Sequence, residues 1–285
     1  MKMIHLDIPG SRQATLEGFL LDVEKLTLGQ EHRRPAVIVC PGGGYIYCSN
    51  AEGEPIALAY SAKGFHSFVL RYSCGHDAAG FAPPKELSWA IGHIRENAQA
   101  WNIDPDKIIV CGFSAGGHLA LSSGLMAENR PNAMILGYPA ASAPKMPGAD
   151  FMLKFLTGKE DPTEEDAVQF DLVPKITAEA PPVFLASTAE DFLTPFGALP
   201  IAQKYASLGR PYELHVFGYG QHGLALANEV TANGSSRYLD PAFAHWLDLS
   251  VIWFHKTFGK LEFVDKSNSR MAAHLRDMGL DLPGF

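Results

Sequence analysis

The chain has 285 residues, of which 47% are hydrophobic and 19% are charged, and its formal net charge is −8. This length and composition suit one large domain with a substantial core, and no low-complexity linker divides residues 1–285 into two. The acidic balance disfavours phosphate backbones and anionic membrane surfaces, so we expect no nucleic-acid partner and no membrane association.

Short apolar, β-branched runs alternate with helical patterns along most of the chain. In order, we predict strand 35–40, helix 54–64, strand 66–72, helix 84–101, strand 107–112, helix 115–127, strands 133–138 and 182–187, helix 196–208, strand 212–217 and a helix around 241–254. Segments 2–8 and 14–22 are more polar and predict an antiparallel pair at one edge. This order predicts an α/β fold with a mainly parallel central sheet and helices on both faces. Residues 258–285 form a polar C-terminal extension to which we assign no function.

The N-terminal residues do not indicate export, and the cysteines do not indicate metal binding. Residues 1–7 lack the apolar core of a signal peptide, and no stretch has the roughly 18 apolar residues of a membrane span. We therefore expect a cytoplasmic protein, with a previously removed signal as the alternative. Cys40 and Cys111 lie in apolar runs that are typical of buried, reduced thiols. The sequence leaves the oligomeric state open, and a homo-oligomer is one of the alternatives.

The segment Gly112-Phe113-Ser114-Ala115-Gly116 matches the G-x-S-x-G pattern of a nucleophile elbow. An apolar strand precedes it and a small-residue helix follows it, so the serine would sit on a sharp strand-to-helix turn. The glycines remove side chains that would collide there, and the helix N-terminus points its positive end at the serine. We predict Ser114 as the nucleophile; the alternative is an inert serine in an ordinary turn.

The run Pro41-Gly42-Gly43-Gly44-Tyr45 follows an earlier predicted strand, the position at which enzymes with a serine on a nucleophile elbow form an oxyanion hole. Attack on a carbonyl places negative charge on its oxygen, and pre-aimed backbone N–H groups stabilise that charge. Consecutive glycines let the backbone approach closely. We expect the N–H groups of Gly43, Gly44 and Ala115 to be the donors, with a flexible glycine-rich turn as the alternative.

Among the 11 histidines, His222 lies beside glycine in a loop shortly after strand 212–217. A loop over the C-terminal edge of the sheet can bring a general base within about 3 Å of the serine hydroxyl. We predict His222 as that base. Four other histidines fall within predicted helices or strands and are expected to be structural: His118, His215, His245 and His255.

Asp191 follows strand 182–187 and completes the chain order Ser114, Asp191, His222 that this fold uses. Its carboxylate would accept a hydrogen bond from the imidazole and set the tautomer. Helix capping is the structural alternative. Three other carboxylates compete for the role: Glu190, Asp161 and Asp166.

Other chemistries find little support in the sequence. It has no H-E-x-x-H, no G-x-G-x-x-G and no cysteine pair at zinc spacing, and His76-Asp77 is an isolated pair. We expect neither a metal nor a cofactor.

Four stretches carry a family resemblance: CPGGGY with the trailing EGEPIA, WNIDPDKIIVCGFSAGGHLA, TAEDFLTP and GYGQHGLAL. On these, the chain from about Ala36 to Leu226 resembles the bacterial acetyl esterase/acetylxylan esterase branch of the α/β-hydrolases. Pro41 stands where many related esterases carry histidine, a change that removes a hydrogen bond steadying the loop.

The resemblance implies a serine carboxylesterase that removes acetyl groups from small acetylated sugars or xylo-oligosaccharides through an acyl-enzyme. Aromatic residues near the predicted site suit a short acyl pocket or stacking on sugar rings, and suit core packing equally well: Tyr45, Tyr47, Phe113 and Phe192. Other functions on the same triad remain open, namely an arylformamidase, a small peptidase or an acyltransferase. A catalytically silent binding protein is a further alternative.

Overall fold

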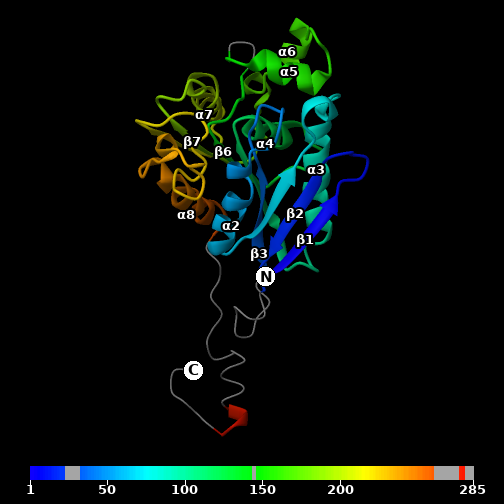
Figure 1. Cartoon of the computed structure of the whole chain (residues 1–285). Coiled ribbons are helices and arrows are strands. Elements are labelled where there is room, and N and C mark those ends of the chain that lie inside the picture. Colours follow the sequence, from blue (N-terminus) through cyan, green and yellow to red (C-terminus); the bar gives the residue numbers. More distant parts are fainter. Residues whose placement is uncertain (23–32, 143–145, 260–275, 280–285) are drawn as a thin grey trace.

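The structure, a computed structural model, describes residues 1–22, 33–142, 146–259 and 276–279. Its centre is an eight-stranded sheet in the order β1-β2-β4-β3-β5-β6-β7-β8 (Figure 1). The strands are β1 (Lys2–Asp7), β2 (Thr15–Leu20), β3 (Arg34–Cys40), β4 (His66–Arg71), β5 (Ile103–Phe113), β6 (Ala133–Gly137), β7 (Val183–Thr188) and β8 (Tyr212–Phe217).

The predicted mixture of strand directions is confirmed. β1 pairs with β2, and β2 with β4, in antiparallel fashion, which makes the predicted edge pair. Every other neighbouring pair in the sheet, from β4 through β3 to β8, is parallel. Because parallel strands run the same way, their carboxyl ends meet at one edge, where ligands bind in open α/β sheets.

Helices cover both faces of the sheet, as predicted. They are α2 (Glu54–Ala62), α3 (Ala82–Glu96), α4 (Ala115–Met126), α5 (Ala149–Thr157), α6 (Glu164–Phe170), α7 (Ala198–Ser207) and α8 (Trp246–Phe258). Short 3₁₀ turns lie at Asn50–Glu52, Gly75–Ala78, Val173–Lys175, Thr194–Phe196, Ser236–Tyr238 and Phe243–His245.

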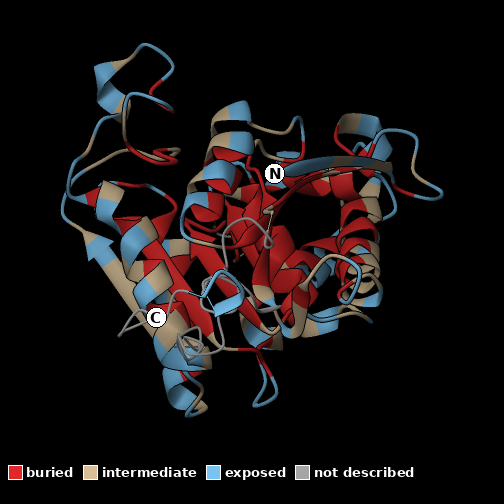
Figure 2. Ribbon diagram, turned by 90° about the horizontal axis from the view of Figure 1, so that it is seen from below, coloured by how far each residue is buried: buried red, intermediate tan, exposed pale blue. Residues whose placement is uncertain are grey.

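Strand β3 shows how the sequence produces two cores. Ala36, Ile38 and Cys40 pack in one cluster together with residues of α3, α4 and α7. The alternate residues Val37 and Val39 pack in a second cluster with residues of α2 and α8. A strand buried on both faces must be apolar throughout, which explains the unbroken hydrophobic run. Figure 2 shows the buried residues concentrated in the strands and on the helix surfaces that face them.

Cys40 and Cys111 are free and fully buried, as their apolar surroundings predicted. Burial raises the pKa of both thiols above the ordinary value, because a thiolate loses its hydration in the core.

Some elements differ from the prediction. Strand β5 begins at Ile103 rather than at residue 107, and its register is irregular opposite Arg34–Ala36. The sequence did not show this earlier start because the run Asp104–Asp106 is polar. His245 lies in a 3₁₀ turn just before the last helix. Helices α5 and α6 had no predicted counterpart, and Figure 1 shows them projecting at the top of the molecule. Most of the extension 258–285 lies outside the described residues.

Candidate active site

Ser114 occupies the single-residue turn between strand β5 and helix α4. Its backbone has φ 51° and ψ −117°, a strained conformation for a residue with a side chain. A Cβ on Gly112 would lie 2.1 Å from the carbonyl oxygen of Gly116, and one on Gly116 would lie 2.0 Å from that of Cys40. Only glycine fits at these two positions, so the sequence pattern and the tight turn have the same steric cause.

The three predicted catalytic side chains meet in one hydrogen-bonded chain. The Ser114 hydroxyl lies 2.8 Å from His222 Nε2, and His222 Nδ1 lies 2.9 Å from Asp191 Oδ2. A carboxylate can only accept, so the proton on the neutral ring is at Nδ1 and Nε2 is free to accept the serine proton. This is the arrangement in which an imidazole acts as a general base towards a serine.

Asp191 is buried, with 2% of its surface exposed, and its second oxygen accepts the Leu193 N–H at 2.8 Å. The neighbouring competitor, Glu190, points elsewhere: its carboxylate accepts the Gly220 N–H at 2.9 Å. The Thr188 hydroxyl donates to the carbonyl oxygen of the same Gly220. Glu190 and Thr188 therefore hold the loop that carries the histidine, whereas Asp191 contacts the imidazole itself.

The glycine-rich loop after β3 lies against the nucleophile. A Cβ on Gly42 would lie 3.0 Å from Ser114 Cβ, and one on Gly43 would lie 2.0 Å from the Tyr47 carbonyl oxygen. Gly43 and Gly44 have φ of 120° and 64°, which is the region that favours glycine. Within the described part of the chain, the N–H groups of Gly43, Gly44 and Ala115 have no hydrogen-bond acceptor. These three backbone donors are thus unused.

Pro41 does not leave this loop unsupported. The Tyr72 hydroxyl donates to the Pro41 carbonyl oxygen at 2.6 Å, and the Gly42 N–H donates to Glu52 Oε2 at 2.9 Å. These two bonds support the loop at Pro41 and at Gly42.

Comparison with known proteins is consistent with this geometry. Residues 21–146 match the BD-FAE family. The solved structure of MGS-M1, an alpha/beta hydrolase enzyme from a Medee basin deep-sea metagenome library, is 35% identical and superposes with a TM-score of 0.76. The match covers 90% of this chain and 97% of that one.

The chain belongs to the α/β-hydrolase family. Two curated relatives are similar at lower coverage. Endo-1,4-beta-xylanase B of Butyrivibrio fibrisolvens is 30% identical over 77% of this chain and 37% of its own length. Acetylxylan esterase of Xylanibacter ruminicola is 30% identical over 66% of this chain and 40% of its own length. The chain therefore spans about two fifths of the length of these two relatives.

The four aromatic residues predicted near the site separate into two groups. Tyr47 and Phe192 are 60% and 55% exposed, and the Phe192 ring centroid lies 5.4 Å from that of His222. Tyr45 and Phe113 are fully buried. Phe113 packs against Tyr138 and Trp246, and the Tyr45 hydroxyl bonds to a histidine in α4. Of the two roles that the sequence left open for Tyr45 and Phe113, core packing is therefore the one that the structure shows, and the tentative assignment to substrate binding is corrected.

That histidine, His118, has the structural role predicted for it. It is fully buried one turn after the nucleophile, and its Nε2 lies 3.0 Å from the Phe170 carbonyl oxygen. A carbonyl only accepts, so Nε2 carries the proton and Nδ1 accepts from the Tyr45 hydroxyl at 2.9 Å. Burial lowers the pKa of His118 to about 4, so the ring is neutral at pH 7.

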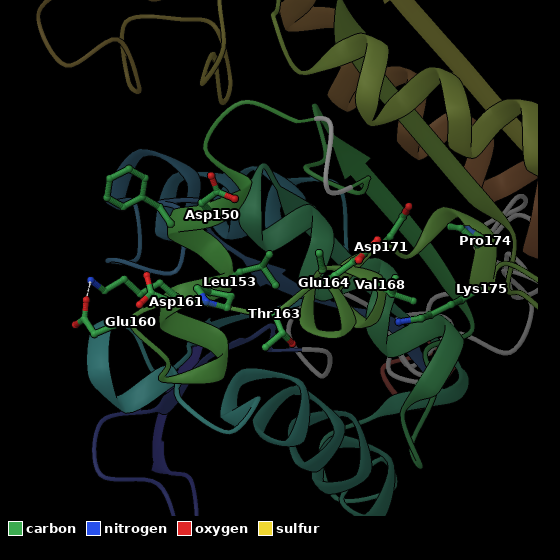
Figure 3. Close-up of a pocket in the computed structure, with 14 residues that line it drawn as sticks. Asp150, Leu153, Glu160, Asp161, Thr163, Glu164, Val168, Asp171, Pro174 and Lys175 are labelled. Atoms are coloured by element: carbon green, nitrogen blue, oxygen red, sulfur yellow. Dashed lines mark hydrogen bonds and ion pairs between the residues drawn. The ribbon is translucent and has the colours of Figure 1, made fainter.

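A separate cavity of about 850 Å³ lies among α5, α6 and the Val173–Lys175 turn (Figure 3). Asp161 lines it, and Asp166 caps α6 by accepting the Thr163 N–H at 2.7 Å. Neither competitor carboxylate is bonded to His222, and none of the triad residues lines this cavity.

Within the described ranges, no helix is long and apolar enough to cross a membrane. In the same part of the chain, no group of three or more His, Cys, Asp or Glu side chains is placed to hold a metal ion.

Two residues of the site escaped sequence reasoning. Glu52 and Tyr138 are buried beside Gly42 and His222, respectively. Tyr138 directly follows strand β6, so its place at the carboxyl edge of the sheet was a readable signal. Glu52 gave no such signal, because nothing in the surrounding sequence distinguishes it from the exposed Glu54.

Proposed function

We propose that this α/β-hydrolase is a serine carboxylesterase that removes short acyl groups, above all acetyl, from acetylated sugars or xylo-oligosaccharides. The observation that carries the proposal is the pair of contacts that joins Ser114, His222 and Asp191 at 2.8 and 2.9 Å. A serine hydroxyl bonded to an oriented imidazole is an activated nucleophile for acyl transfer.

In the first half of the reaction, Ser114 Oγ attacks the ester carbonyl carbon while its proton moves to His222 Nε2. The Gly43, Gly44 and Ala115 N–H groups stabilise the negative oxygen, each donor being worth about 3 kcal/mol at the transition state. Asp191 stabilises the imidazolium through the bond to Nδ1. The carbon–oxygen bond to the alcohol then breaks, and His222 gives its proton to the leaving alkoxide.

In the second half, His222 Nε2 takes a proton from a water molecule whose oxygen attacks the acyl-Ser114 carbonyl. The tetrahedral adduct collapses, the bond to Ser114 Oγ breaks, and the proton on Nε2 returns to that oxygen. The carboxylic acid leaves and the serine is regenerated.

Two observations support a sugar ester as the substrate. The curated relatives are named as a xylanase and an acetylxylan esterase, which points to decorated xylan as the source of the ester. Two exposed aromatic rings belong to the loops of the site: Tyr47 follows the glycine loop, and Phe192 lies beside His222. Such rings offer flat apolar faces for a sugar ring to contact.

The test measures acetate release from acetylated xylo-oligosaccharides beside p-nitrophenyl acetate, butyrate and octanoate, and the anilide p-nitroacetanilide. We expect acetate from both acetyl esters, a steep loss at longer acyl chains, and a fall of at least about 10³-fold in Ser114→Ala. Hydrolysis of the aryl ester alone would contradict the sugar assignment. Preferred cleavage of the anilide would indicate an amidase, and transfer of acetyl to added glycerol would indicate an acyltransferase.

A further inference from the structure

Two buried side chains outside the triad connect the loops that carry it. Glu52 ends the Asn50–Glu52 turn and Tyr138 follows strand β6; they are 5% and 1% exposed. Glu52 Oε2 accepts the Gly42 N–H at 2.9 Å, and Oε1 accepts the Tyr138 hydroxyl at 2.7 Å. The Tyr138 oxygen in turn accepts the Ala225 N–H at 2.9 Å. Three hydrogen bonds thus run without a break from Gly42 to Ala225.

The ends of this chain of bonds are functional loops. Gly42 precedes the two glycines whose N–H groups are unused, and it packs against Ser114. Ala225 lies three residues after His222 in the same loop, where φ of 51° is a strained value for alanine. Its carbonyl oxygen accepts the Trp246 Nε1–H at 2.8 Å, so Ala225 is held from both sides.

Tyr138 also contacts the base directly. Its ring lies 5.0 Å from the His222 ring, edge to face. Its own backbone has φ of 36°, and its N–H bonds to Ala186 in strand β7 at 2.7 Å. A strained backbone persists only where its surroundings over-determine it, which is the case here.

The burial of Glu52 requires both of these partners. A buried carboxylate is costly unless its oxygens accept hydrogen bonds, and here each oxygen has one donor from a different loop. If either donor were lost, one oxygen of the buried Glu52 carboxylate would have no hydrogen-bond partner. The carboxylate therefore holds the loop of Gly42 and the loop of Tyr138 together.

We propose that Glu52 and Tyr138 are positioning residues that set the distance between the oxyanion loop and the histidine loop. The inference rests on the proposed ester hydrolysis, in which the amides and His222 act on the same carbonyl group. Their burial keeps both side chains from the substrate, so they act through Gly42 and His222. A displacement of about 1 Å between catalytic groups can cost about 10²-fold in rate, and the cost appears in kcat because the donors engage the charge that develops in the transition state.

The first test compares Tyr138→Phe with Tyr60→Phe, a matched control. Tyr60 is equally buried and its hydroxyl bonds to Ser250 at 2.8 Å, within the α2–α8 core rather than at the catalytic residues. On p-nitrophenyl acetate we expect Tyr138→Phe to lower kcat by about 10- to 100-fold with KM within about twofold. Tyr60→Phe should keep kcat within about twofold of the wild-type value, while its Tm should fall by about as much as that of Tyr138→Phe. An equal kcat in both variants would overturn the inference.

The second test compares two substitutions of Glu52. In Glu52→Gln, the amide oxygen can still accept the Gly42 N–H, so one of the two links survives, while the amide N–H₂ faces the Tyr138 hydroxyl. Glu52→Ala removes both. We expect kcat to fall at least about tenfold further in Glu52→Ala than in Glu52→Gln. Equal losses in the two variants would contradict a role in positioning.

A third readout separates this inference from the proposed substrate. The rate at which a fluorophosphonate probe labels Ser114 depends on the nucleophile, the base and the oxyanion donors, and not on ester turnover. We expect Tyr138→Phe to be labelled about tenfold or more slowly than the wild type. If the wild type is labelled but cleaves no ester, the proposed function fails while slow labelling of Tyr138→Phe still supports positioning. If wild type and variant are labelled equally fast, positioning alone fails.

Discussion

Acidification should destabilise this protein through His118. The neutral ring donates from Nε2 to the Phe170 carbonyl and accepts the Tyr45 hydroxyl at Nδ1, and it stacks on the Phe170 ring at 4.1 Å. A second proton on the ring would place a donor at Nδ1 opposite the Tyr45 hydroxyl and a charge in the core. Burial, the largest cause, therefore lowers the pKa of His118 to about 4 in the folded state.

The sign and size follow from proton linkage. Below the ordinary pKa of 6.5 the unfolded chain binds a proton at this ring, whereas the folded chain does not until about pH 4. Stability is therefore full above pH 6.5 and falls as the pH falls through this window. The window spans about 2.5 pH units at about 1.4 kcal/mol each, less about 0.4 kcal/mol because half of the folded-state rings are protonated at pH 4. The free energy of unfolding should therefore drop by about 3 kcal/mol.

Urea unfolding between pH 7.5 and pH 4 measures this loss. In His118→Gln, the amide can donate to Phe170 and accept from Tyr45, but it does not titrate. The difference in the free energy of unfolding between the wild type and this variant should therefore shrink by about 3 kcal/mol from pH 7.5 to pH 4. His5→Gln, which removes an exposed imidazole on β1, is the control and should follow the wild-type curve. Parallel curves for the wild type and His118→Gln would refute the reasoning.

Three further outcomes are expected. Asp191→Asn should lower kcat on p-nitrophenyl acetate by about 10³- to 10⁴-fold because the imidazole loses its preferred tautomer, whereas Glu190→Gln should lower kcat by less than about tenfold. A larger loss in Glu190→Gln than in Asp191→Asn would make Glu190 the triad acid. Gly116→Ala should lower the free energy of unfolding measured in urea by more than about 3 kcal/mol, since the new Cβ would lie 2.0 Å from the Cys40 carbonyl oxygen. An unchanged free energy of unfolding would contradict the steric argument. Phe192→Ala should raise KM for acetylated xylo-oligosaccharides more than for p-nitrophenyl acetate, and equal changes would argue against a sugar contact.

The features that the sequence predicted well depend on local stereochemistry. Strand β3 is apolar at every position because both of its faces are buried, and this shows as an unbroken run. The elbow was recognisable because only glycine fits two positions before and two positions after Ser114. Helix α6 was missed although Thr163 and Asp166 form a capping box, since three acidic residues in a short helix resemble a solvated loop.

The sequence by itself determined most of the strands and helices, α5 and α6 excepted, and the strained turn at Ser114, because these depend on neighbours within a few residues. The order of the triad followed from the chain order that this fold uses. The tertiary structure decided what depends on residues far apart in the chain. It placed Asp191 at the imidazole and Glu190 on Gly220, although the two carboxylates are adjacent. It also buried Tyr45 and Phe113 in the core and brought Glu52 to Tyr138 across 86 positions. A hydrogen bond between distant residues leaves no periodic mark on the sequence, so only the folded chain shows which polar groups meet.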